Sequence, residues 1–143
     1  MNITFSDEEY RRVMLLTLLG EWMINAIRKD PDPAMEDTAS KVYAQAKDTP
    51  MAELVAFNAD LLSWAPTEEF ESEAHAMIDQ YDDKTFWEEL TARMIERDLI
   101  DQHGERTVSS MRPEQREREA SSIGKAYTQE FEERGIERLR VTD

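Results

Sequence analysis

The chain has 143 residues and a formal net charge of −15 at pH 7, so it is strongly acidic and long enough to bury a core. It contains no cysteine, which excludes disulfides, thiolate zinc sites and cysteine nucleophiles. A field of this sign repels nucleic acid and anionic lipid, so we expect neither a nucleic-acid nor a membrane partner.

The first predicted helix, Ser6–Arg28, is the most apolar segment of the chain. Ser6 and Glu9 have the spacing of a capping box, which marks its start. Apolar residues cover most of its circumference, and Glu21 and Asn25 lie on its one polar stripe. The segment is too short and too interrupted to span a bilayer. We therefore predict a helix buried at the centre of a bundle, with a homodimer interface as the alternative.

Five more amphipathic helices are indicated by cap residues, prolines and glycines. We expect them to begin at Asp32–Pro33, Thr49–Pro50, Thr67, Asp82 or Asp83, and Pro113, the last two ending at Gly104 and Gly135. Both ends of the chain alternate apolar and polar residues, so Ile3–Phe5 and Leu139–Val141 are predicted to pair as a small two-stranded β-ribbon. The predicted fold is an all-α, single-domain helical bundle of about six helices over residues 1–143.

Several short runs carry a resemblance to known proteins: Glu9–Arg12, Gly20–Ala26, Phe86–Leu90, Arg97–Ile100 and Gly135–Leu139. Through them the chain resembles a group of short, acidic bacterial hypothetical proteins, over most of its length. The resemblance implies a single helical domain and no particular chemistry.

Acidic residues are concentrated in the middle of the chain, where no Lys or Arg occurs from Asp48 to Asp83. The residues that we expect to form an acidic interaction surface are Glu68, Glu69, Glu71, Glu73 and Asp79. A surface of this kind attracts basic protein partners. The alternative is that these carboxylates only keep the protein in solution.

Two polar positions interrupt apolar helix faces. Glu21 and Asn25 are one turn apart and either form a ligand site or mark where the first helix meets water. Asp98 projects into an apolar arc, with Arg97 at its edge, and a buried carboxylate needs an ion pair or hydrogen bonds. Asp98 is therefore either a ligand-orienting acid or half of a structural ion pair.

No catalytic motif or cofactor site is indicated. His75 lies one turn from Glu71 and from Asp79, but this face is predicted to point outward and all three ligands come from one helix, so we expect no metal. The chain lacks a Gly-x-Ser-x-Gly elbow and a phosphate-binding glycine loop. We expect no cofactor and favour a protein that is not an enzyme.

The function favoured by the sequence is that of an intracellular interaction or regulatory protein whose acidic segment binds a basic partner. One alternative is a DNA-mimic inhibitor, whose surface carboxylates imitate phosphates. Another is an enzyme or ligand-binding protein with a pocket around Glu21, Asn25 and Asp98. Because the N-terminus lacks the pattern of a signal peptide, we expect a cytoplasmic protein, either a monomer or a homodimer.

Overall fold

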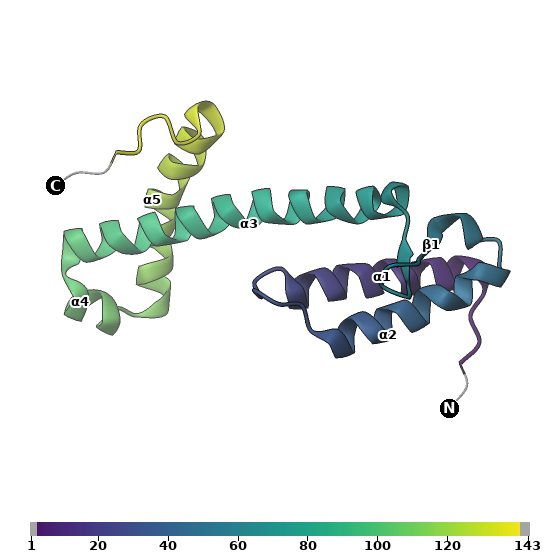
Figure 1. Cartoon of the computed structure of the whole chain (residues 1–143). Coiled ribbons are helices and arrows are strands. Elements are labelled where there is room, and N and C mark those ends of the chain that lie inside the picture. Colours follow the sequence, from purple (N-terminus) through teal and green to yellow (C-terminus); the bar gives the residue numbers. More distant parts are fainter. Residues whose placement is uncertain (1–2, 141–143) are drawn as a thin grey trace. The chain divides into compact units, whose positions relative to one another are not determined.

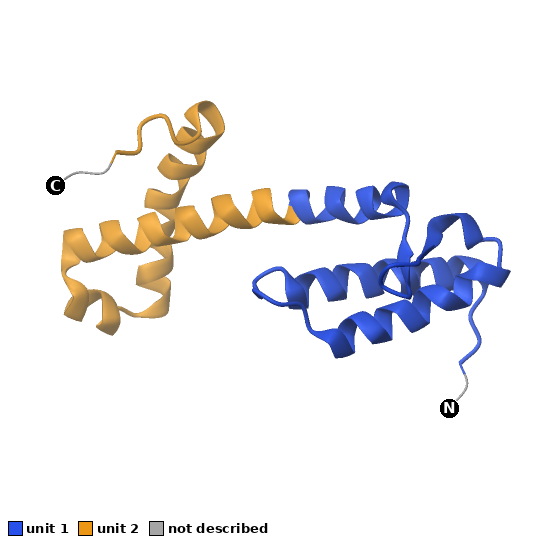
Figure 2. Ribbon diagram, in the orientation of Figure 1, with its two compact units in different colours: residues 1–80 blue, residues 81–143 orange. Residues whose placement is uncertain are grey.

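The computed structural model describes residues 3–140 and divides into two compact units, Met1–Gln80 and Tyr81–Asp143 (Figure 2). In chain order the elements are α1 Asp7–Asn25, α2 Pro33–Ala44, 3₁₀ turns Gln45–Asp48 and Ala52–Leu54, β1 Val55–Asn58, β2 Ser63–Pro66, α3 Glu68–His103, α4 Glu105–Ser110 and α5 Pro113–Arg134 (Figure 1). The predicted helical character is confirmed, but the described residues contain five α-helices rather than about six. The single domain over residues 1–143 stays a prediction.

The first two helices begin where their cap residues predict. The hydroxyl of Ser6 accepts the backbone N–H of Glu9 at 3.3 Å, and the Glu9 carboxylate accepts the N–H of Ser6 at 2.8 Å. In α2 the Asp32 carboxylate accepts the N–H of Ala34 at 3.0 Å, and Pro33 occupies the first turn. These contacts satisfy backbone donors that have no partner inside the helix.

The third helix, predicted to open at Thr49–Pro50 and to end at Pro66 and Thr67, is wrong, because most of this segment forms an antiparallel hairpin. Strand β1 pairs with β2 in a register that sets Val55 opposite Pro66 and Asn58 opposite Ser63. Apolar residues at short spacing fit a helix face and a strand equally well. The β-branched and aromatic residues of this segment favour the strand.

The turn of the hairpin is built around Asn58. Its side-chain oxygen accepts the backbone N–H groups of Asp60 at 3.0 Å and Leu61 at 3.1 Å, which closes an Asx turn. Leu62 follows with φ of +52°, a left-handed conformation that few non-glycine residues adopt. A side chain that was expected inside a helix stripe thus reverses the chain direction.

The hairpin is not the predicted terminal ribbon. Ile3–Phe5 and Leu139–Arg140 adopt no strand. The remaining residue of that prediction, Val141, lies outside the described residues.

The predicted fourth and fifth helices are one continuous helix, α3. No glycine or proline occurs between Glu68 and His103, so nothing in the backbone interrupts it. The carboxylate of Asp83, expected to cap a new helix, instead accepts the indole N–H of Trp87 one turn later at 3.2 Å. Gly104, with φ of +80°, ends α3 as predicted. The short helix α4 follows where only a turn was expected.

The core of unit 1 lies among α1, α2, the hairpin and the start of α3. Its buried residues are Met14, Ala39, Tyr43, Ala46, Met51, Val55 and Phe70. The backbone N–H of Trp64 donates to the Ser40 hydroxyl at 2.8 Å and so fastens the hairpin to α2.

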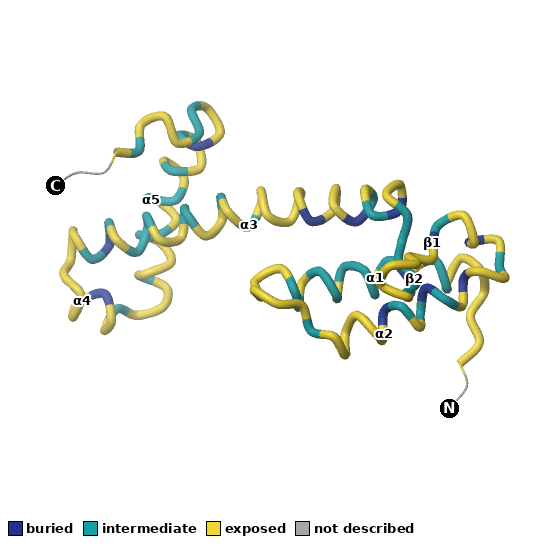
Figure 3. Tube along the Cα trace, viewed as in Figure 1, coloured by how far each residue is buried: buried dark blue, intermediate teal, exposed yellow. Residues whose placement is uncertain are grey.

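Helix α1 is not the buried centre that its composition predicts. Within unit 1 it contributes a single fully buried residue, Met14, and most of its length is half-buried or exposed (Figure 3). Leu16 and Met23 are 68% and 56% exposed. The physical reason is that α2, the hairpin and α3 cover one side of α1 and leave the other side of this unit open.

In unit 2, α3 and α5 approach closely at Gly124. A Cβ atom there would lie 3.0 Å from Cδ1 of Ile95, so this position suits a residue without a side chain. Aromatic rings extend the packing: the ring centroids of Trp87 and Phe131 are 5.4 Å apart, and those of Tyr127 and Phe131 are 5.7 Å apart. Phe131 is 8% exposed and is the most buried of these rings.

Two tyrosines of unit 1 differ in how their hydroxyls are satisfied. Tyr10 donates to the backbone carbonyl of Val42 and so joins α1 to α2. Tyr43 is 1% exposed, and its hydroxyl has no hydrogen-bond partner among the described residues. A buried hydroxyl without a partner destabilises the folded state.

Replacing these tyrosines by phenylalanine is expected to have opposite effects. Tyr43→Phe removes a desolvated hydroxyl and should raise the free energy of unfolding by about 1 kcal/mol, whereas Tyr10→Phe loses a hydrogen bond and should lower it by about 1 kcal/mol. Urea unfolding of both variants measures the difference. Equal destabilisation by the two changes would show that the Tyr43 hydroxyl is hydrogen-bonded in solution.

Candidate functional site

The predicted acidic surface lies on the first part of α3, within unit 1. Glu68, Glu69 and Asp79 are exposed, and Glu71 is half-buried. The fifth residue of the prediction, Glu73, has a structural partner and is described next.

Glu73 joins α3 to α1 through Arg11. The guanidinium donates to both carboxylate oxygens, one of them at 3.2 Å, and its central carbon lies 5.3 Å from the centre of the Phe70 ring. These hydrogen bonds from Arg11 lower the pKa of the Glu73 carboxyl. Glu73 therefore stabilises unit 1, and its charge is less available to a partner.

The other carboxylates at this end of α3 are not neutralised. Among the residues that the structure describes, none of these forms an ion pair: Glu68, Glu69, Glu71, Asp79, Asp82 and Asp83. The helix dipole favours Glu68, Glu69 and Glu71 in the first turn, but it does not reach Asp79.

The polar stripe of α1 is partly engaged inside unit 1. The side-chain oxygen of Asn25 accepts the backbone N–H of Asp32 at 2.9 Å and so holds the loop before α2. Burial raises the pKa of Glu21, and the nearby charges of Glu36 and Glu71 raise it further. Asn25 thus has a structural role, while Glu21 lies in a negative environment.

Asp98 and Arg97 form an ion pair, with a third member that the sequence did not indicate. Nε and Nη2 of Arg97 lie 2.9 and 2.7 Å from the same Asp98 oxygen. The hydroxyl of Tyr127, on α5, donates to the other Asp98 oxygen and accepts from Arg97 at 2.9 Å. Burial raises the pKa of Asp98, but the hydrogen bonds from Tyr127 and Arg97 outweigh it, and the net shift is downward.

The members of the predicted pocket belong to different units. Glu21 and Asn25 lie in unit 1, whereas Arg97 and Asp98 lie in unit 2. The structure brings the second pair together and shows a structural role for Asn25. The convergence of all four in one pocket stays a prediction.

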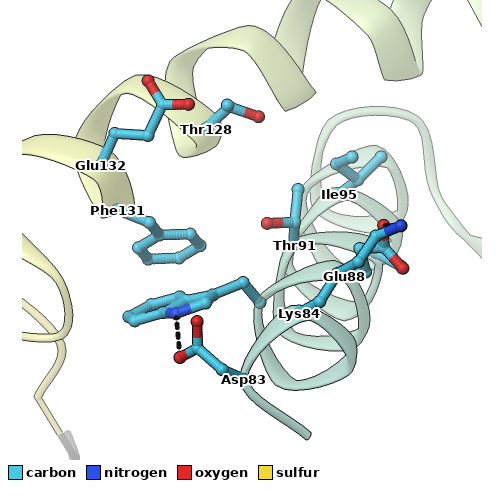
Figure 4. Close-up of a pocket in the computed structure, with 10 residues that line it drawn as sticks. Asp83, Lys84, Glu88, Thr91, Ile95, Thr128, Phe131 and Glu132 are labelled. Atoms are coloured by element: carbon cyan, nitrogen blue, oxygen red, sulfur yellow. Dashed lines mark hydrogen bonds and ion pairs between the residues drawn. The ribbon is translucent and has the colours of Figure 1, made fainter. Parts of the chain in front are cut away.

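Sequence reasoning missed a groove between α3 and α5, within unit 2. It has a volume of about 620 Å³, with Trp87, Ile95 and Phe131 among its apolar lining. Its polar lining comes from Asp83, Lys84, Glu88, Thr91, Thr128 and Glu132 (Figure 4). The signal in the sequence was the four-residue spacing of Asp83, Trp87, Thr91 and Ile95, which sets them on one helix face. The contribution of α5 has no such signal.

No family model, curated protein or solved structure matches this chain. In the described part of the chain, no group of three or more His, Asp or Glu side chains is arranged to hold a metal ion. None of the described helices has the length and hydropathy needed to cross a membrane.

Replacing Glu21 by glutamine is expected to stabilise the protein at neutral pH. Its raised folded-state pKa means that ionising Glu21 opposes folding, and this loss of stability grows as the pH rises through that pKa. The gain from Glu21→Gln should shrink as the pH falls below about 4, where the wild-type carboxyl is protonated in both states. Urea unfolding across this range measures it, with exposed Glu114→Gln as control. A Glu21→Gln protein that is less stable than the wild type at neutral pH would contradict a raised pKa of Glu21 in the folded state.

Replacing Asp98 by asparagine is expected to act in the opposite direction. The lowered folded-state pKa means that ionised Asp98 favours folding, and this stabilisation is lost as the pH falls through that pKa. Asp98→Asn should therefore lower the free energy of unfolding by about 1 kcal/mol at neutral pH and have little effect in strong acid. Asp101→Asn, exposed and three residues later, is the matched control. Unchanged unfolding of Asp98→Asn at every pH would exclude a structural pair.

Proposed function

We propose that this protein is an interaction or regulatory protein whose acidic surface binds a basic protein partner. The surface consists of Glu68, Glu69, Glu71 and Asp79, with Glu73 engaged by Arg11. The observation that carries the proposal is that these four carboxylates, three of them exposed and Glu71 half-buried, form no ion pair among the described residues.

Repulsion within α3 supports a partner that supplies positive charge. Asp79 precedes Asp83 by four residues, and neither forms an ion pair among the described residues. Like charges at this spacing destabilise a helix by about 0.2–0.5 kcal/mol per pair. A basic surface placed against α3 would remove part of this repulsion on binding, which makes association favourable.

Ion pairs elsewhere in the chain show that the acidity of α3 is a local property. In unit 2, Glu130 pairs with Arg134 at 3.0 Å and with Arg138 at 3.1 Å, and Glu96 pairs with Arg116. Unit 2 therefore pairs several of its glutamates with its own arginines. A basic partner gains most by contacting the first part of α3.

Neutralising the surface is expected to weaken binding of a basic peptide. In a Glu68→Gln/Glu69→Gln/Glu71→Gln/Asp79→Asn variant, the Kd for a fluorescent peptide of alternating arginine and glycine should rise about tenfold at about 50 mM salt. Fluorescence anisotropy measures the Kd. The salt dependence of binding should also become less steep, because fewer charge contacts remain.

The matched control neutralises four exposed carboxylates outside this surface: Asp101, Glu105, Glu114 and Glu137. It changes the net charge by the same amount and should raise the Kd by less than about twofold. An equal loss of affinity in both variants would mean that the peptide responds to net charge alone, and the proposal would then be wrong.

A further inference from the structure

The groove between α3 and α5 has an aromatic wall. Trp87 and Phe131 line it from the two helices, with ring centroids 5.4 Å apart and an angle of 37° between the ring planes. Phe86 packs against Trp87 on the same helix, at 4.9 Å between centroids. The indole is half-buried, so part of its surface faces the groove.

Carboxylates at the rim of the groove lack cationic partners. Asp83 accepts the indole N–H of Trp87, shown by the dashed line in Figure 4, and forms no ion pair among the described residues. The same holds for Glu132, on α5. The third carboxylate, Glu88, is paired with Lys84 at 3.6 Å, so the one cation lining this groove is already neutralised.

An aromatic face beside free carboxylates is the arrangement that binds a cation. The electron-rich face of an indole attracts a guanidinium or ammonium group, and a planar guanidinium also stacks on it. Thr91, from α3, and Thr128, from α5, lie on facing sides of the groove (Figure 4) and supply hydroxyl oxygens that accept N–H groups. Arginine presents five such donors, so it fits this lining better than lysine.

The groove adjoins a second hollow, so the space between α3 and α5 exceeds what a single small ion needs. A second hollow of about 640 Å³ shares Thr91, Ile95, Thr128 and Glu132 with the first. It continues along α5 past Lys125 and Gly124 to Glu117, so its lining adds one cation and one carboxylate. A peptide can therefore lie along α5 while one of its side chains enters the aromatic part.

We infer that this groove binds an arginine side chain of an extended basic segment in a protein partner, stacked against Trp87 and paired with Asp83 and Glu132. The inference rests on the proposed function in that it takes the partner to be basic. It adds a second recognition site beside the acidic surface of Glu68, Glu69, Glu71 and Asp79, and the aromatic wall of this second site selects for shape as well as charge.

The test compares the arginine–glycine peptide with a peptide in which citrulline replaces every arginine. Citrulline has nearly the same shape but no charge. The arginine peptide should bind the full-length protein at least about tenfold more tightly in fluorescence anisotropy. Equal affinities would mean that the groove takes an apolar or neutral occupant, and would overturn the inference.

Charge-neutral variants locate the binding. Asp83→Asn/Glu132→Gln should raise the Kd of the arginine peptide about tenfold and leave the citrulline peptide unchanged. The matched control, Asp82→Asn/Glu137→Gln, removes the same charge from exposed positions that do not line the groove. An equal effect of the two variants would overturn the inference.

The indole N–H resonances report where the peptide binds, and this measurement does not require a variant that weakens binding. The chain has three tryptophans, Trp22, Trp64 and Trp87, so three indole cross-peaks are expected in a nitrogen–proton NMR spectrum. Trp87→Phe assigns one of them. The arginine peptide should shift the Trp87 peak and leave the other two in place, whereas an unmoved Trp87 peak would overturn the inference.

The outcomes also separate this inference from the proposed function. If the four-carboxylate variant of α3 loses affinity for the arginine peptide and Asp83→Asn/Glu132→Gln does not, the inferred arginine site in the groove is wrong and the proposed function is supported. If Asp83→Asn/Glu132→Gln alone loses affinity, binding by the acidic surface is wrong and the arginine site in the groove is supported.

Discussion

The contact of Arg11 with Glu73 and Phe70 is the interaction on which the arrangement of unit 1 depends. The segment Asp48–Asp83 contains no Lys or Arg, so cations that neutralise it must come from outside it. At α3 the cation that does so in the described residues is Arg11, and it is used on one carboxylate. The same contact therefore joins α1 to α3, while the other carboxylates of α3 up to Asp83 have no ion-pair partner among the described residues.

In unit 2 the charges are arranged differently. Arginines and glutamates are interspersed along α5, and several of them form ion pairs within the unit. Arg116 reaches Glu96 on α3, and His103 reaches Glu119 on α5. The contact of Arg116 with Glu96 pairs opposite charges on the two helices. The groove lies where this pairing is incomplete, at Asp83 and Glu132, beside aromatic rings that already pack for structural reasons. A binding site of this kind needs no dedicated loop. Two packed helices produce it where carboxylates without ion pairs lie beside aromatic rings.

Local signals in the sequence predicted the helix ends well, whereas contacts between distant segments were not predicted. The caps at Ser6 and Asp32 and the end at Gly135 depend on a few neighbouring residues, and the structure has them. The hairpin after Pro50 was missed because it depends on the Asn58 turn and on a bond from Trp64 to Ser40, far away in the sequence. The continuity of α3 was missed because Asp82 and Asp83 have the residue type of a helix N-cap. In the structure the Asp83 carboxylate instead accepts the indole N–H of Trp87.

The candidate site shows the same division, and the two interrupting carboxylates make the reason clear. Composition alone located the acidic part of α3, because a segment without Lys or Arg can be recognised in the sequence without knowledge of the fold. Glu21 and Asp98 look alike in the sequence, each a carboxylate on a largely apolar helix face. In the structure, Asp98 accepts from Tyr127 and Arg97, which lower its pKa, while burial and the carboxylates of Glu36 and Glu71 raise the pKa of Glu21. Three of these neighbours, Tyr127, Glu36 and Glu71, come from other helices than the carboxylate they act on. The periodicity of one helix therefore indicates that a carboxylate is unusually placed, but not whether its pKa is raised or lowered.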